Sequence, residues 1–280
     1  MKYAFKFLLS CIIGLSFFNT YSQKLELKWK TDTLLRVPES VLLDVGKKVL
    51  YVANIDGNPE GKDGVGFISK VGLNGKIENL KWVTGLDAPK GMGLFGATLY
   101  VADITSVVVI DIPSGKITSK IEIDGAKFLN DITVDKKGTV YVSDTNTGKI
   151  HAIKNNKAEL YFESSEFKGI NGLLALPNEL YVVDFATGTN YKLSADKKLA
   201  KFGTTAEGAD GVVPVGNGDY LVSSWHGEIY YVTAKGESTK ILDTKDQKIS
   251  AADIEFDAKS KMLFIPTFFS NMVVAYELKK

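Results

Sequence analysis

The stretch LYVAD at residues 99–103 recurs along the chain with small changes. Each copy is rich in β-branched, aliphatic or aromatic residues, which favour strands, and most end in a small or acidic residue. Successive copies end roughly 40 to 50 residues apart, a period typical of repeat proteins. The copies are LYVAN at 50–54, LYVAD at 99–103, VYVSD at 140–144 and LYVVD at 180–184, with weaker ones, YLVSS at 220–224 and LFIPT at 263–267.

Shorter alternating runs lie between these copies, such as KIHAI at 149–153, and turn dipeptides such as Asn74-Gly75 separate them. This pattern predicts strands joined by hairpins and excludes helical solenoids of similar period. Six repeats of about four strands predict an all-β protein, a six-bladed β-propeller with four-stranded blades. We expect residues 25–29 to close the ring as a strand beside residues 272–276, which removes an exposed sheet edge.

The N-terminus has the layout of a secretory signal peptide. Two lysines precede an apolar run at residues 7–18, too short to span a bilayer, and small residues follow at 20–22. We therefore expect residues 1–22 to be removed, leaving a single exported domain at 23–280, periplasmic or secreted. Lipid anchoring at Cys11 is the alternative, although few residues would precede it. Cys11 is the sole cysteine, so the mature chain would have neither disulfides nor thiol chemistry.

The charge balance gives no sign of a nucleic-acid partner. Removal of Lys2 and Lys6 changes the formal charge from +1 to −1 (+1 − 2), and the sequence has no basic stripe or acidic tail. No transmembrane segment is expected in the mature chain. We expect a monomer or weak oligomer that acts on a small molecule.

A polar residue opens an apolar strand roughly 13 to 15 residues before the end of each repeat copy. In an antiparallel hairpin, the start of one strand and the end of the next lie at the same edge. If the first strand of each blade lines the axis, one face carries two polar rings. The inner ring would contain Glu39, Lys90, Asn130, Asn171, Asp210 and Asp253, and the outer ring Asn54, Asp103, Asp144, Asp184, Ser224 and Thr267. The outer ring also has a simpler interpretation, as residues that cap turns.

The inner ring predicts a cation. Glu39, Asp210 and Asp253 cannot all be ionised near a dry axis without shifted pKa values or a positive charge. Together with the neutral amides, these acids offer only oxygen ligands, which suit a hard divalent ion such as Ca²⁺ or Mg²⁺. The alternative is internal, because Lys90 belongs to the same ring and could neutralise a carboxylate.

Four dipeptides, one per repeat, resemble the gluconolactonase / regucalcin / luciferin-regenerating-enzyme family over essentially the whole mature chain: Glu39-Ser40, Asn130-Asp131, Asn171-Gly172 and Asp210-Gly211. That family consists of six-bladed propellers with one axial divalent cation. The resemblance implies that Glu39, Asn171 and Asp210 are metal ligands, for Ca²⁺ first and for Mg²⁺, Mn²⁺ or Zn²⁺ as alternatives. It implies that Asn130 contacts metal-bound water or substrate, and that Asp210 is also the candidate catalytic general base.

The chain departs from this family at two places. Ser40 leads into Val41, where the family has Pro and Trp after its glutamate. Phe128 stands where the family often has an arginine, two positions before Asn130. An arginine would bind sugar hydroxyls, so Phe128 argues against a sugar lactone as substrate.

Aromatic residues follow the predicted outer ring in three blades and would form one wall of a pocket: Phe185, Trp225, Phe268 and Phe269. With the ring residues, the expected substrate contacts are Asn130, Lys90, Asp253, Phe128, Phe185, Trp225, His226 and Phe268. His151 lies in an alternating strand and is expected to be structural, and Trp29 and Trp82 to pack between blades. The insertion at residues 54–66 is either a lid or a tolerated surface loop.

Two functional classes remain open. The first is an exported metal-dependent lactonase or esterase, in which a cation polarises a carbonyl and Asp210 assists the attack of water. The chain has no Gly-x-Ser-x-Gly elbow, and no protein nucleophile is needed. The second is a non-catalytic propeller that binds a ligand or protein on the same face, with a structural metal or none. The inner ring favours the enzyme, whereas Lys90 and Phe128 favour the binding protein.

Overall fold

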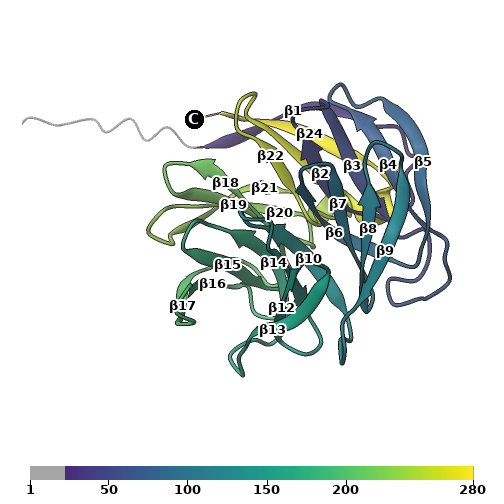
Figure 1. Ribbon diagram of the computed structural model, residues 1–280. Coiled ribbons are helices and arrows are strands. Elements are labelled where there is room, and N and C mark those ends of the chain that lie inside the picture. Colours follow the sequence, from purple (N-terminus) through teal and green to yellow (C-terminus); the bar gives the residue numbers. More distant parts are fainter. Residues whose placement is uncertain (1–22, 280) are drawn as a thin grey trace, which may run out of the picture.

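The computed structural model describes residues 23–279 and has the predicted architecture. Six antiparallel sheets of four strands each surround a common centre (Figure 1). The six-bladed, four-stranded propeller is therefore confirmed. The proposed signal peptide at residues 1–22, including Cys11, lies outside the described residues.

The first five blades each use four consecutive strands, with the first strand innermost. Blade one contains β2 (Pro38–Asp44), β3 (Val49–Asn54), β4 (Gly66–Gly72) and β5 (Ile77–Leu86), and blade two contains β6 (Pro89–Phe95), β7 (Thr98–Asp103), β8 (Ser106–Asp111) and β9 (Lys116–Glu122). Blade three contains β10 (Leu129–Val134), β11 (Val140–Asp144), β12 (Lys149–Lys154) and β13 (Lys157–Glu163). Blade four contains β14 (Ile170–Ala175), β15 (Glu179–Asp184), β16 (Thr189–Ser194) and β17 (Leu199–Thr204). Blade five contains β18 (Ala209–Gly216), β19 (Asp219–Ser224), β20 (Glu228–Val232) and β21 (Ser238–Asp243).

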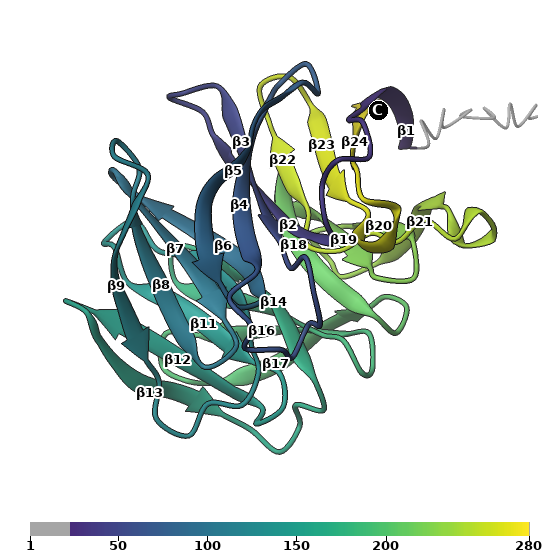
Figure 2. The ribbon, with the colours of Figure 1, turned by 90° about the vertical axis from the view of Figure 1, so that its right-hand side faces the viewer.

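The sixth blade joins the two ends of the described chain. It contains β22 (Glu255–Asp257), β23 (Met262–Pro266), β24 (Val273–Lys279) and, as its outermost strand, β1 (Lys24–Lys30). Strand β1 runs antiparallel to β24 with Leu25 opposite Leu278, and Figure 2 shows the two side by side. Ring closure by the N-terminal strand is as expected. Two short 3₁₀ helices, η1 (Lys245–Gln247) and η2 (Phe268–Ser270), follow β21 and β23.

The blades are held together by apolar clusters between neighbouring sheets. One such cluster joins blades one and two and includes Tyr51, Leu99 and Val101, all fully buried. Trp82 stacks on Tyr51 with ring centroids 5.0 Å apart, and Trp29 packs against Phe264 at 5.8 Å. Both tryptophans pack as expected, and each fully buried leucine or valine in such a cluster contributes about 1.5–3 kcal/mol.

In the first five blades, the outer-ring residues cap the loop that leads into the inner strand, whereas Thr267 in blade six bonds to Met272 in the turn that follows it. The Asp103 carboxylate accepts hydrogen bonds from the backbone N–H groups of Asp87 and Ala88, at 2.8–3.1 Å. Asp144 accepts the N–H groups of Lys127 and Phe128 in the same way. The simpler interpretation of the outer ring therefore holds, since these polar side chains position the residues that follow.

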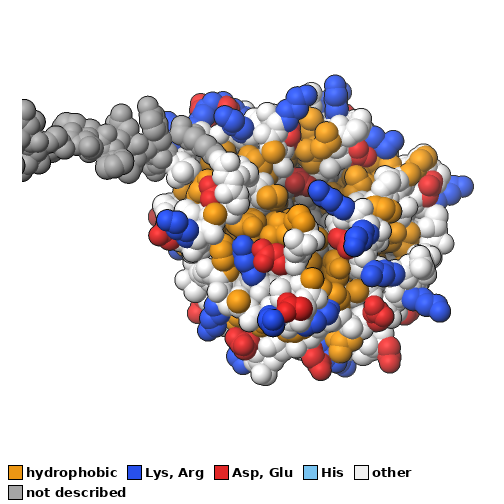
Figure 3. Space-filling view, turned by 60° about the vertical axis from the view of Figure 1, so that its left-hand side comes forward, with side chains coloured by type: hydrophobic (Ala, Val, Ile, Leu, Met, Phe, Trp, Pro, Cys, Tyr) orange, Lys and Arg blue, Asp and Glu red, His pale blue; other side chains and the backbone are white. Residues whose placement is uncertain are grey.

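The surface mixes charged and apolar side chains. On the face drawn in Figure 3, hydrophobic side chains gather near the middle, and Lys, Arg, Asp and Glu side chains lie both among them and around the rim. In the described part of the chain, no helix has the length and apolar character required to cross a membrane.

Candidate functional site

The inner strands bring the polar residues of successive blades together at the axis. In the first five blades, the ring residue is the second residue of the innermost strand. A glycine follows it in blades two, four and five, and a Cβ there would collide with the neighbouring blade: at Gly91 it would lie 2.5 Å from the Asp131 side chain, and at Gly172 it would strike the Asp210 carbonyl oxygen. These glycines thus let neighbouring inner strands approach closely.

A cavity of about 170 Å³ lies over this part of the axis. Five of the six predicted inner-ring residues line it, together with the predicted aromatic contacts Phe128, Phe185, Trp225 and Phe268, whereas Phe269 of the predicted aromatic wall does not. The lining residues are Glu39, Ile55, Pro59, Lys90, Phe128, Asn130, Thr145, Asn171, Phe185, Asp210, Trp225 and Phe268. The structure therefore brings most of the predicted site into one enclosure.

Residues at one equivalent position of the repeat form much of the cavity wall. Five lining residues each come directly after an outer-ring cap: Ile55, Thr145, Phe185, Trp225 and Phe268. Except for Phe268, their backbone N–H groups bond to the loop before the inner strand, as in Phe185 N–H to the Gly169 carbonyl at 2.7 Å and Trp225 N–H to the Gly208 carbonyl at 2.7 Å. Five of the six blades, all but blade two, therefore contribute a lining residue from the same position of the repeat.

Three oxygen atoms on the floor of the cavity have no hydrogen-bond partner. They are Glu39 Oε2, Asn171 Oδ1 and Asp210 Oδ1, in side chains that are only 3–5% exposed. Burial raises the pKa of Glu39 to about 8, with Asp253 adding to the shift and Lys90 opposing it. Burial, then Glu39 and Asp253, raise the pKa of Asp210 well above its ordinary value, and the Asn171 amide opposes this.

Lys90 does not form an ion pair with the floor. Its ammonium donates hydrogen bonds to the carbonyl oxygens of Pro59 at 2.9 Å and Ala88 at 3.0 Å, and lies 4.4 Å from the centre of the Phe128 ring. Across residues 23–279, no carboxylate oxygen lies within 4 Å of this ammonium. Burial lowers the pKa of Lys90 to about 8, although the charge of Glu39 acts in the other direction. The geometry therefore favours a cation over a lysine as the partner of these acids.

Asp253 lies one position out of the predicted ring. It forms a parallel β-bridge with Ser40, and the Ser40 hydroxyl donates to its carboxylate at 2.8 Å. Since side chains alternate along a strand, this shift of one residue moves Asp253 away from the floor. It lines a second cavity of about 230 Å³, further along the inner strands, together with Asp131. The expected substrate contact by Asp253 is therefore corrected to a position in the deeper layer.

The two histidines lie outside the candidate cavity. His226 is exposed and meets the Trp225 ring edge-on at 5.7 Å. His151 is buried in β12 within blade three. The sequence reasoning missed Ile55, Thr145 and Pro59 as lining residues. Ile55 and Thr145 share the register of Phe185 and could have been found from it, whereas Pro59 belongs to the 54–66 insertion and carries no repeat signal.

The floor offers oxygen donors of the type that a hard divalent cation prefers. Two carboxylates and one amide each present an oxygen with no other partner, and such buried orphan oxygens are rare in native structures. No cluster of three or more His, Cys, Asp and Glu side chains suited to a metal occurs within the described residues. The three residues of the floor include only two of these types, Glu39 and Asp210, because the third, Asn171, is an asparagine. The side chains of Glu39, Asn171 and Asp210 are therefore compatible with the divalent cation that the sequence predicts at this position.

Three bulky apolar residues in or next to the cavity have strained backbones. Val37, Ile104 and Phe268 all have positive φ angles, of 49°, 57° and 50°, which bulky side chains rarely adopt. All three belong to one apolar cluster with Ile55 and Ala252, and Phe268 itself lines the cavity. Strain of this kind costs about 1–3 kcal/mol per residue and is typical of functional sites.

Comparison with known proteins shows the fold but no family. No protein-family model and no curated protein matches the sequence. A proposed gluconolactonase of known structure matches 91% of this chain and 92% of its own, with a TM-score of 0.68 and 14% identity. Streptogramin B lyase matches 92% and 98%, with a TM-score of 0.66 and 11% identity. An inactive variant of virginiamycin B lyase from Staphylococcus aureus, solved with quinupristin, matches 92% and 100%, with a TM-score of 0.66 and 14% identity. The chain therefore shares its fold with enzymes of more than one reaction class.

Proposed function

We propose that this protein is an exported, metal-dependent hydrolase that opens a lactone or cleaves a carboxylic ester. The observation that carries the proposal is the set of three partnerless oxygens of Glu39, Asn171 and Asp210 at the floor of an enclosed cavity. A divalent cation bound there, most simply Ca²⁺, would favour the ionised carboxylates and polarise the substrate carbonyl. The likeness in fold to a proposed gluconolactonase supports the same reading.

Asp210, Asn130 and Lys90 have different roles in this hydrolysis. Asp210 takes a proton from water as the hydroxyl adds to the acyl carbon, and returns it to the alkoxide oxygen as the acyl–oxygen bond breaks. Asn130 lines the cavity, and its amide donates to the Thr145 hydroxyl at 3.2 Å, which orients it. Lys90 holds Pro59 over the cavity, and the aromatic side chains exclude water around the reacting group.

Hydrolysis of lactones and aryl esters by the mature chain, with calcium and with chelator, tests this function. We expect turnover that chelator abolishes and that Asp210→Asn lowers at least about a hundredfold. The exposed Glu207, three residues before Asp210, provides the matched control Glu207→Gln. Reaction in ¹⁸O-water should place the label in the acid product, as hydrolysis requires and a lyase reaction does not.

The competing function is a propeller that binds a ligand without reaction. Lys90 and Phe128 favour it, because their contact fills one side of the cavity with a cation stacked on a ring. Tight binding of small esters with no turnover, in the presence of calcium, would establish this function instead.

A further inference from the structure

We propose that the substrate of this site carries an alkyl or aryl group and is not a polyhydroxylated sugar lactone. The proposal rests on the proposed function, because it concerns the part of the substrate that does not react. Its basis is the division of the cavity into a polar floor and an aromatic wall, which we define as Phe128, Phe185, Trp225 and Phe268.

The partnerless oxygen atoms among the lining residues all come from inner strands. Glu39, Asn171 and Asp210 occupy the axis, where the inner strands meet. Ile55 and Pro59 join the aromatic wall on the sides, so the reacting carbonyl would face oxygens and the rest of the substrate would face carbon. Such an arrangement stabilises a ligand with one polar end and an apolar remainder.

The polar side chains nearest the wall are already engaged. Lys90 donates to two backbone carbonyls, and the amide of Asn130 donates to Thr145. A sugar hydroxyl placed along the wall would lose its water without gaining a partner. Each such hydroxyl would weaken binding on the order of ten- to a hundredfold.

The size of the cavity also indicates an apolar substrate of modest size. A cavity of ~150 Å³ is large enough to hold benzene, and this one has about 170 Å³. Beyond it, Phe269 is 66% exposed and meets Trp225 and Phe268 edge-on, at 6.0 and 4.8 Å. The apolar surface therefore continues from the cavity to the solvent, where it can cover the end of a short alkyl chain.

A pair of six-membered lactones tests the proposal directly. δ-Octalactone carries a propyl group, whereas D-glucono-1,5-lactone carries hydroxyls on a ring of the same size. With the calcium-loaded mature chain, we expect kcat/KM to be at least about tenfold higher for δ-octalactone. Phe185→Ala should lower that value about tenfold, mainly by raising KM. The control Phe95→Ala removes an exposed ring at the opposite end of β6 and should change it less than about twofold.

A binding measurement separates failure of this inference from failure of the proposed function. Trp225 lines the cavity, so its fluorescence reports occupancy, and Trp225→Phe identifies its signal. If neither lactone is hydrolysed, a fluorescence change with δ-octalactone alone would still support an apolar site. A preference for the gluconolactone in turnover would overturn the inference while leaving the hydrolase intact. No response to either lactone, or an equal response, would also overturn it.

Discussion

The ammonium of Lys90 lies 2.9 Å from the carbonyl oxygen of Pro59 and binds the 54–66 insertion to the inner strand of blade two. The insertion therefore lines the cavity through Pro59 and is more than a tolerated surface loop. The Lys90 ammonium bonds to backbone carbonyls and forms no ion pair with the acids of the floor. The sequence left two questions open: whether the insertion is a lid or a surface loop, and whether Lys90 neutralises a carboxylate. The contact between Lys90 and Pro59 bears on both.

Replacement of Lys90 by methionine should loosen the insertion without abolishing cation binding. Lys90→Met removes the hydrogen bond to Pro59, so amide hydrogen exchange should increase in residues 55–65. Calcium affinity should stay the same or rise, because a nearby positive charge is removed. Loss of calcium binding in a folded Lys90→Met protein would contradict this account.

The metal-free protein should lose stability as the pH rises. Burial raises the pKa of Glu39 to about 8 from its ordinary value of 4.5. Between these values the unfolded state releases the proton more readily, so stability should fall from about pH 5 to about pH 8 and then level off. The pKa of Asp210 is raised too and acts in the same direction. Thermal unfolding in chelator at pH 5.5, 7 and 8.5 measures this trend. Glu39→Gln should lessen the fall, because Asp210 still titrates, and saturating calcium should reverse it, whereas wild-type stability that rises with pH would contradict the prediction.

The axis should not tolerate a methyl group at Gly172. A Cβ there would strike the carbonyl oxygen of Asp210, so Gly172→Ala must push two of the three proposed ligands apart. We expect a loss of about 1–3 kcal/mol in unfolding free energy and at least tenfold weaker calcium binding. In Gly46→Ala the nearest atom would be Asp44 Oδ1, at 3.4 Å, and this control should behave like wild type. Unchanged calcium affinity in Gly172→Ala would argue against Asn171 as a ligand.

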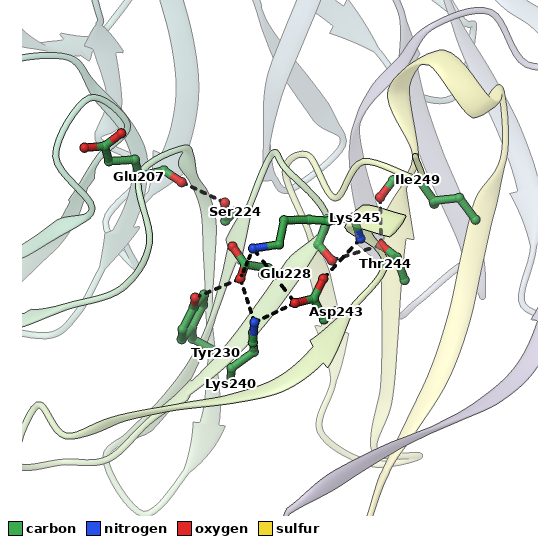
Figure 4. A network of polar contacts seen from close by, with 10 residues as sticks. Glu207, Ser224, Glu228, Tyr230, Lys240, Asp243, Thr244, Lys245 and Ile249 are labelled. Carbon is green, nitrogen blue, oxygen red and sulfur yellow. Dashed lines mark hydrogen bonds and ion pairs between the residues drawn. The ribbon is translucent and has the colours of Figure 1, made fainter. Parts of the chain in front are cut away.

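A buried carboxylate away from the cavity should stabilise blade five. Figure 4 shows Glu228 accepting hydrogen bonds from Lys240 at 3.0 Å, Lys245 at 2.8 Å and Tyr230 at 3.2 Å. Burial alone would raise the pKa of Glu228, but the hydrogen bonds from Lys245 and Lys240 outweigh it and lower the pKa.

The stabilisation from Glu228 should accordingly be present above pH 4.5 and disappear as the pH falls through its lowered pKa. Glu228→Gln should cost about 1–3 kcal/mol in urea unfolding at pH 7 and much less at pH 3. The exposed Glu237 provides the control Glu237→Gln, which should be neutral at both values. An equal effect of Glu228→Gln at the two pH values would show that its charge is not responsible.

Much of the fold was predictable because the repeat is strong. The stretch LYVAD and its copies form the second strand from the axis in every blade, and in blade six the copy LFIPT falls largely in β23. The same register predicted that Glu39, Lys90, Asn130, Asn171 and Asp210 meet at one cavity. It did so because each residue opens an inner strand, and these strands meet at the axis.

Other features depended on contacts between blades that periodicity does not carry. Asp253 precedes β22, and its bridge to Ser40 sets it one residue out of the ring, a shift that the spacing alone could not reveal. The direction of the Lys90 side chain depends on Pro59, which lies in an insertion found in one blade. His226 follows Trp225 directly, but it lies in the turn after β19 and its side chain is exposed to solvent.

The most direct test of the central claim is calcium binding by calorimetry to the purified mature chain after treatment with chelator. We predict one calcium per chain, with binding lost in both Glu39→Gln and Asp210→Asn and retained in Glu207→Gln. Absence of binding to the wild type, or equal binding in all three variants, would contradict a cation site built from Glu39, Asn171 and Asp210, and with it the hydrolase.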